Sequence, residues 1–180
     1  MSQPTIYRRV PKGRPSIGFQ LEAPAGIELR EGSALLCREA RSDGRVMGEL
    51  EVSIFPAALV IDRDGILAEK AVEAMNGLAI LRRAVVPDPV SLPGANGFRA
   101  AAVCSASLPY IYSFAIAPSD LGVDGGVLIT IRAAGPEWPA ADHVLRSLRV
   151  LTRTGRVATN CDADEAPILP VVALAREEES

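Results

Sequence analysis

The chain has 180 residues, of which 48% are hydrophobic, and a formal net charge of −3 at pH 7. This length suits one domain with short appendages, and a core of about 150 residues needs no disulfide or metal to be stable. The composition argues against a disordered chain and against a strongly basic nucleic-acid-binding protein. The charge is uneven, because residues 1–14 carry four basic residues and no acid, and residues 155–180 carry six acids against two arginines.

Short runs that alternate polar and apolar residues fill the first third of the chain. They predict strands over 5–10 (within a polar, basic arm), 17–23, 27–30, 33–40 and 46–55. In the last of these, Leu50, Val52 and Ile54 point one way. Glu49 and Glu51 therefore point the other way, because side chains alternate along a strand.

A helix is predicted next, with Asp62 or Asp64 as its cap and Gly77 at its end. Its apolar residues recur at helical spacing: Leu67, Ala71, Ala74, Met75 and Leu78. Two strands are predicted after it, over 79–86 and 90–92, separated by a break at Pro87-Asp88-Pro89. Near the C-terminus we predict a second helix that starts at Gly135-Pro136-Glu137 and runs to about Ser147, and a closing strand over 150–152.

The stretch 97–133 predicts three consecutive strands of an antiparallel meander, over 99–107, 110–117 and 126–133. The first strand is built almost entirely of small residues. The second carries Tyr110, Tyr112 and Phe114 on one face. We expect a helix to pack closely over the small strand while the aromatic side chains fill the remaining volume.

The order of elements predicts an α+β fold, an antiparallel meander sheet packed with two main α-helices, because strands follow one another by hairpins and not by βαβ crossovers. We divide the chain into a basic N-terminal arm (1–16), a sandwich domain (17–153) and an acidic, apolar C-terminal tail (154–180).

Four stretches resemble the PsbP-like, Mog-type α/β/α sandwich family: GFQLEAPAGI at 18–27, the helix over 64–78, Gly97-Phe98, and VLRSLRV at 144–150. The resemblance covers about residues 17–150. One departure is Ile27, where many relatives have an aromatic residue. The family includes photosystem accessory proteins, a Ran-binding protein and bacterial effector-associated secretion chaperones. The resemblance therefore implies a non-catalytic binding or chaperone role, and it transfers no catalytic residue.

The sequence contains no convincing catalytic or metal-binding constellation. His143 is the only histidine, and a general base needs a partner beside it in space. The acids of Asp62-Arg63-Asp64-Gly65 are better explained by helix capping than by a calcium loop. Nucleotide-binding glycine motifs and the GxSxG elbow are absent. We expect no catalytic residue, metal or cofactor, although an enzyme with an unrecognised site near Asp62, Asp64 or His143 stays an alternative.

Cysteine usage and hydropathy bear on location. Cys37 and Cys104 fall in predicted strands, and Cys161 falls in the polar tail. An odd count of distant cysteines argues against a secreted disulfide scaffold. Neither a signal peptide nor a membrane span is evident. We therefore expect a cytoplasmic protein.

Two features suggest binding of another protein. The aromatic ladder is either core or the floor of an open apolar groove. The tail carries an apolar run that either packs on its own domain or docks on another chain. The predicted partner-binding residues are Tyr110, Tyr112, Phe114, Ile168, Leu169, Val171 and Val172. We expect an adaptor or chaperone-like accessory protein, with a structural subunit of a larger assembly as the alternative and self-association left open. We interpret the basic arm as a solvated segment and not as a nucleic-acid contact, because its basic residues are not interleaved with aromatic ones.

Overall fold

A computed structural model describes residues 3–59, 62–92, 94–119, 123–152 and 169. Its strands are β1 (Thr5–Arg9), β2 (Gly18–Ala23), β3 (Glu28–Glu31), β4 (Leu35–Ala40), β5 (Val46–Pro56), β6 (Ile80–Leu92), β7 (Ala95–Cys104), β8 (Tyr110–Pro118), β9 (Gly125–Ala133) and β10 (Arg149–Leu151). Its helices are α1 (Arg63–Glu73) and α2 (Pro139–Ser147). Neither of these described helices has the length and hydrophobicity that a membrane crossing requires.

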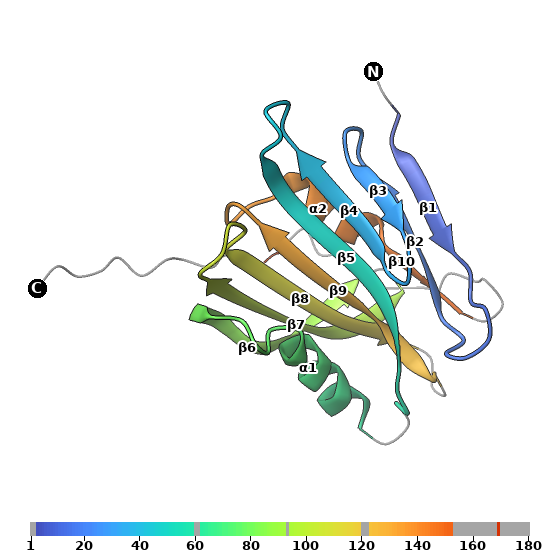
Figure 1. Ribbon diagram of the computed structural model, residues 1–180. Coiled ribbons are helices and arrows are strands. Elements are labelled where there is room, and N and C mark those ends of the chain that lie inside the picture. Colours follow the sequence, from blue (N-terminus) through green and yellow to red (C-terminus); the bar gives the residue numbers. More distant parts are fainter. Residues whose placement is uncertain (1–2, 60–61, 93, 120–122, 153–168, 170–180) are drawn as a thin grey trace, which may run out of the picture.

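The strands form two antiparallel sheets, not the one that the sequence predicts (Figure 1). A large sheet has the order β3–β4–β5–β9–β8–β7–β6, and a small sheet has the order β1–β2–β10. The predicted α+β class with antiparallel pairing is confirmed, although strands dominate the fold. The meander of β7, β8 and β9 is confirmed in register, with Tyr112 opposite Ala101 and Ile131.

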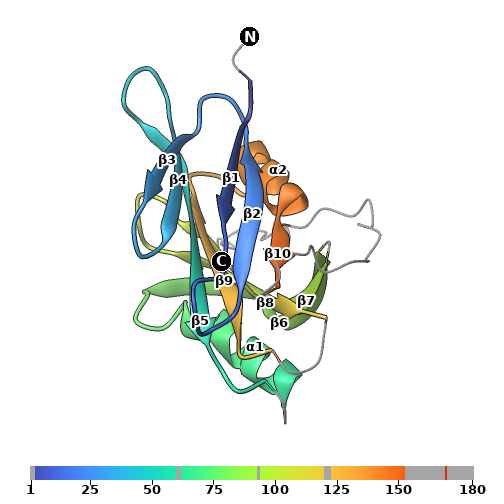
Figure 2. The same cartoon turned by 90° about the vertical axis from the view of Figure 1, so that its right-hand side faces the viewer.

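The main core lies between the two sheets, and α2 packs against β2 of the small sheet (Figure 2). The alternation of side chains along each strand explains this core, because every second residue turns inward: Phe19 and Leu21 of β2, and Leu50 and Val52 of β5. These four side chains are at most 1% exposed. The same core contains Val150 and Leu169, so it joins residues from both ends of the described chain.

The other face of the large sheet is partly covered by α1, which packs mainly on β7, β8 and β6. Leu67 and Ala71 of α1, and Met75 just beyond its end, are buried there. They meet small side chains of the sheet: Ala100, Ala102, Cys104, Ala115 and Ala117. Close packing of a helix over the small-residue strand is therefore confirmed. The helices nevertheless do not both cover the meander, because α2 belongs to the small-sheet side.

The predicted cap of α1 is confirmed at Asp62, whose Oδ1 accepts a hydrogen bond from the backbone N–H of Gly65 at 3.0 Å. The helix ends at Glu73, slightly before the predicted end. Gly77 follows with a φ of +80°, a conformation that favours glycine in the turn toward β6.

The predicted break at Pro87-Asp88-Pro89 is wrong, because β6 runs through it as one strand. Two properties make this possible. β6 is an edge strand, where the missing N–H groups of proline cost little. Its pairing with β7 also shifts register three times, the last shift lying between Val85 and Asp88. The turn after β6 is correspondingly short, and β7 begins at Ala95.

The basic N-terminal arm contributes a strand to the domain, since β1 pairs with β2 from Thr5 to Arg9. The Arg9 guanidinium lies over the ring of Phe19, 5.5 Å from its centroid. It also donates hydrogen bonds to the carbonyl oxygens of Gly32 and Ser33. These contacts join the edge of the small sheet to the loop between β3 and β4.

Candidate functional site

The outer face of the large sheet has two halves that differ in what covers them. We call the outer face of β6, β7 and β8 the covered half, because α1 lies on it. We call the outer face of β3, β4, β5 and β9 the open half. Its side chains are mainly polar or charged, and several are exposed to solvent, Glu51 and Arg132 among them.

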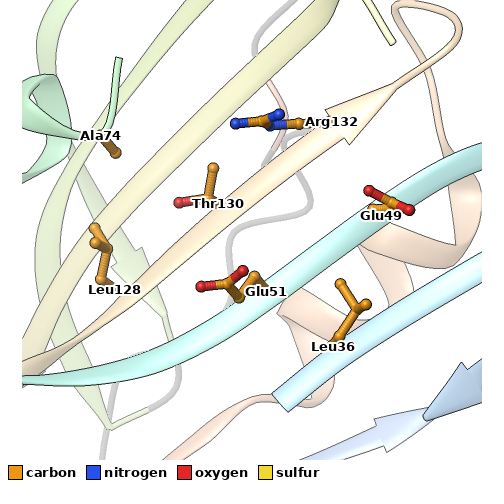
Figure 3. Close-up of a pocket in the computed structure, with 7 residues that line it drawn as sticks. All are labelled: Leu36, Glu49, Glu51, Ala74, Leu128, Thr130 and Arg132. Carbon is orange, nitrogen blue, oxygen red and sulfur yellow. The ribbon is translucent and has the colours of Figure 1, made fainter. Parts of the chain in front are cut away.

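A groove of about 390 Å³ lies on the open half where it meets the end of α1 (Figure 3). Its lining residues come from β4, β5, β9 and the C-cap of α1: Leu36, Glu49, Glu51, Leu128, Thr130, Arg132 and Ala74. This volume falls in the range of about 300–1,000 Å³ that is typical of ligand sites. Polar atoms make up most of the exposed lining of the groove.

Strand register builds the groove as two rows of side chains. One row crosses the sheet as Glu28, Arg38, Glu49 and Arg132, so that acids and bases alternate. The next row crosses it as Arg30, Leu36, Glu51, Thr130 and Ser113. The inward turn of Leu50 and Val52 forces their neighbours on β5 outward into these rows.

Ion pairing uses some of these charges and leaves others. Arg38 Nε lies 3.4 Å from Glu49 Oε1, and Arg30 Nε lies 2.8 Å from Glu28 Oε1. The hydrogen bond to the Glu28 carboxylate raises the pKa of Arg30 above its ordinary value. Arg132 lies opposite Glu49 in register but makes no ion pair with it. Figure 3 shows its guanidinium extending away from Glu49, toward the side of the groove that Ala74 forms.

A buried hydroxyl lies beside this row. Ser113 of β8 is the neighbour of Thr130 on the same face, and its side chain is 0% exposed. Its Oγ has no hydrogen-bond partner in the described part of the chain. An unpaired buried hydroxyl lowers stability, and the row ends here, because the next residue across the sheet is Ala100 of β7.

The predicted aromatic ladder is buried between the sheets. Tyr110 is 8% exposed, and Tyr112 and Phe114 are 0% exposed. The Tyr112 hydroxyl donates to the carbonyl of Pro136 at 2.6 Å, and burial raises the pKa of Tyr112 to about 12. The ladder therefore packs as core, and in this structure the three side chains offer no surface on which a partner could dock.

Of the four predicted tail residues, the structure describes only Leu169. It is 8% exposed and packs in the core between the sheets. At this position the tail contacts its own domain. Ile168, Val171 and Val172 lie outside the described residues, and so does Cys161.

The alternative enzyme site is not assembled around its predicted residues. Asp62 caps α1 on the outer side of the large sheet, whereas His143 lies on α2, which packs beside β2 on the inner side of the large sheet (Figure 2). His143 Nε2 lies 3.1 Å from Glu22 Oε1, a half-exposed contact that joins α2 to β2. Ser147 adds to this joint by accepting a hydrogen bond from the Glu22 N–H. Within the described ranges, no three His, Cys, Asp or Glu residues gather as a metal site.

Sequence reasoning found one side of the groove and missed the rest. The alternation in β5 already placed Glu49 and Glu51 outward. Thr130 and Arg132 alternate in the same way along β9, and this was the available signal. What the sequence could not provide is the pairing of β5 with β9, two strands that are separated along the chain by α1 and the β6–β8 strands.

Comparison with known proteins leaves the chain without an assigned family. No model of a known protein family matches it, and no curated protein matches it either.

Proposed function

We propose that the protein is a non-catalytic, protein-binding adaptor or chaperone-like accessory protein that receives its partner on the open half. One observation carries the proposal: α1 packs mainly on β6, β7 and β8, so it leaves most of the outer face of β9, β5 and β4 uncovered, and this surface contains a polar groove. The partner is another protein, because the groove opens onto a broad sheet face.

The resemblance to the PsbP-like, Mog-type sandwich family supports the same kind of role, because its members named above are accessory and binding proteins. The proposal also includes a cytoplasmic location and the absence of an enzymatic activity. The latter is supported by the separation of Asp62 and His143 on opposite sides of the large sheet. The binding surface is the outer face and not the aromatic ladder, since the ladder is buried.

The test uses the whole chain as bait in a lysate of the cells that make it. Glu51→Lys reverses a charge in the groove, and Glu69→Lys is the matched control on the exposed side of α1. The proposal expects one protein to co-purify in equal amounts with the native chain and the Glu69→Lys variant, and to be depleted with Glu51→Lys. Equal recovery by all three baits contradicts it, as does the absence of a specific partner. Circular dichroism spectra check that both variants keep the native fold.

A second candidate, a structural subunit that assembles with copies of itself, is favoured by the edge strand β1. Ile6 is 67% exposed there, and Val10 beside the strand is 45% exposed. Apolar side chains on a free edge favour addition of another strand. Light scattering after size exclusion separates the two roles: assembly that Ile6→Lys abolishes supports the subunit, and a monomer at high concentration contradicts it.

A further inference from the structure

The groove holds one acid and one base that the protein leaves without ion pairs. Glu49 is engaged by Arg38 at 3.4 Å. Glu51 and Arg132 make neither an ion pair nor a side-chain hydrogen bond within the described residues. Both are exposed to solvent, and both line the groove. Thr130 is the cross-strand partner of Glu51 and lies two residues before Arg132 on β9. A ligand that satisfies both must therefore carry a positive and a negative group.

The separation of the two backbone positions that carry these charges follows from the register. Glu51 faces Thr130, and Arg132 lies two residues further along β9, so the pair is a diagonal of the antiparallel ladder. Diagonal positions of this kind are about 7–8 Å apart. In an extended peptide, side chains on one face are two residues apart, which corresponds to about 6.8 Å. In a helix, neighbours on one face lie only about 5–6 Å apart.

We propose that the groove binds an extended segment of the partner protein in which a basic and an acidic residue stand two positions apart. The inference rests on the proposed function and names the chemistry of the same site. The basic side chain pairs with Glu51, and the acidic side chain pairs with Arg132. The intervening residue points away from the groove, so its identity is free.

The apolar residues of the groove fit such a segment as well. Leu36 lies next to Glu51 in its row, and Leu128 lies beside Thr130 on β9. Both are half-buried, so they offer apolar surface to the methylene stem of a lysine or arginine. Each exposed ion pair contributes little to affinity. The groove therefore selects the charge pattern of a segment, and the wider face supplies the remaining affinity.

The probe is the blocked peptide acetyl-Ala-Lys-Ala-Glu-Ala-amide, titrated at low ionic strength into the isotope-labelled full chain. Backbone amide shifts in NMR spectra report where it binds. We expect shifts in β5 and β9 around Glu51 and Arg132, and about threefold weaker binding when either charged residue of the peptide is replaced by alanine. High salt should weaken the binding. No shift around the groove at millimolar peptide overturns the inference.

Charge reversal provides the sharper test, because each variant predicts its own best ligand. Glu51→Lys should prefer the Glu-Ala-Glu peptide, and Arg132→Glu should prefer the Lys-Ala-Lys peptide. The matched controls Glu69→Lys and Arg41→Glu, both at exposed positions outside the groove, should keep the native preference. A variant of either groove residue that keeps the native preference overturns the inference.

The two proposals fail in different ways. The charge pattern is refuted, and the adaptor role stands, if a cellular partner depends on Glu51 but the peptides cause no amide shifts around the groove. Peptide binding with the predicted swaps, but without any partner that depends on Glu51, upholds the charge pattern and refutes the adaptor role.

Discussion

The covered and open halves of the large sheet share one backbone architecture but differ in the side chains on their outer face. On the covered half, β7 and β8 present alanines, which let α1 approach closely. On the open half, β5 and β9 present Glu51 and Arg132, which stay in solvent. On the inner face, β4 and β5 of the open half and β7 and β8 of the covered half all contribute buried apolar side chains to one core. The size and charge of every second residue thus decide where a helix packs and where a surface remains available.

The largest expected difference between the halves concerns a leucine on each. Leu67→Ala removes a fully buried α1 side chain and should lower the free energy of unfolding by about 2–5 kcal/mol. Leu36→Ala is the matched change on the open half, where the side chain is only half-buried, and should cost less than about 1 kcal/mol. Urea unfolding followed by circular dichroism measures both. Equal losses would contradict the division of the sheet into two halves.

The pH dependence of stability in the alkaline range tests the burial of Cys37, which lies on the inner face of β4, behind the open half. Burial raises the pKa of the Cys37 thiol from 9.0 to about 12. The folded chain therefore keeps this proton above pH 9, where the unfolded chain releases it. The contribution of the neutral thiol to the free energy of unfolding is fully present below pH 9 and is lost as the pH rises toward 12. At pH 10.5 the loss should be about 2 kcal/mol.

Cys37→Ala should reduce this dependence. Its stability at pH 7 will be lower because of the cavity, so the comparison is the change in unfolding free energy between pH 7 and pH 10.5 in each protein. An identical pH slope in both proteins would show that the thiol of Cys37 is not protected from titration.

A larger side chain beneath α1 gives a smaller effect. Ala102 is fully buried under the helix, and Ala102→Leu should cost about 1–3 kcal/mol by overpacking. Thr130→Leu adds a similar side chain beside the groove and should change stability by less than about 0.5 kcal/mol. Thermal unfolding distinguishes them, and a Thr130→Leu loss as large as that of Ala102→Leu would mean that the open half is packed after all.

The smallest expected effect has the opposite sign. Ser113→Ala removes a buried hydroxyl that has no partner and leaves an alanine among alanines. The variant should gain about 1 kcal/mol of stability, because desolvation of the unpaired hydroxyl no longer opposes folding. A shift of the urea midpoint at an unchanged slope measures this gain. A loss would show that the hydroxyl is hydrogen-bonded in solution.

Local patterns predicted most strands and both helices, because each depends on residues that are near one another in sequence. The β5 strand, the Asp62 cap of α1 and the meander with its small and aromatic strands are all of this kind. Outward placement of Glu49 and Glu51 came from the same alternation. These features needed no knowledge of which strands pair.

Tertiary pairing decided what the sequence could not. The division into two sheets depends on β10 joining β2 and not the large sheet. The continuation of β6 through its two prolines depends on the strand lying at an edge. The groove itself depends on the pairing of β5 with β9, which places Glu51 and Arg132 at diagonal positions of neighbouring strands. The burial of the aromatic ladder depends on the small sheet, which covers its face.

Trp138 gives the protein a built-in optical reporter. The indole ring lies against Gly48, where a Cβ would come within 2.5 Å of the ring, and its Nε1 donates a hydrogen bond to Glu39. The chain has no other tryptophan. Fluorescence excited at the indole band therefore reports on a single junction, where the β4–β5 hairpin meets the segment that leads into α2. A red shift of the emission would reveal that this junction has opened, even while the rest of the sheets stays intact.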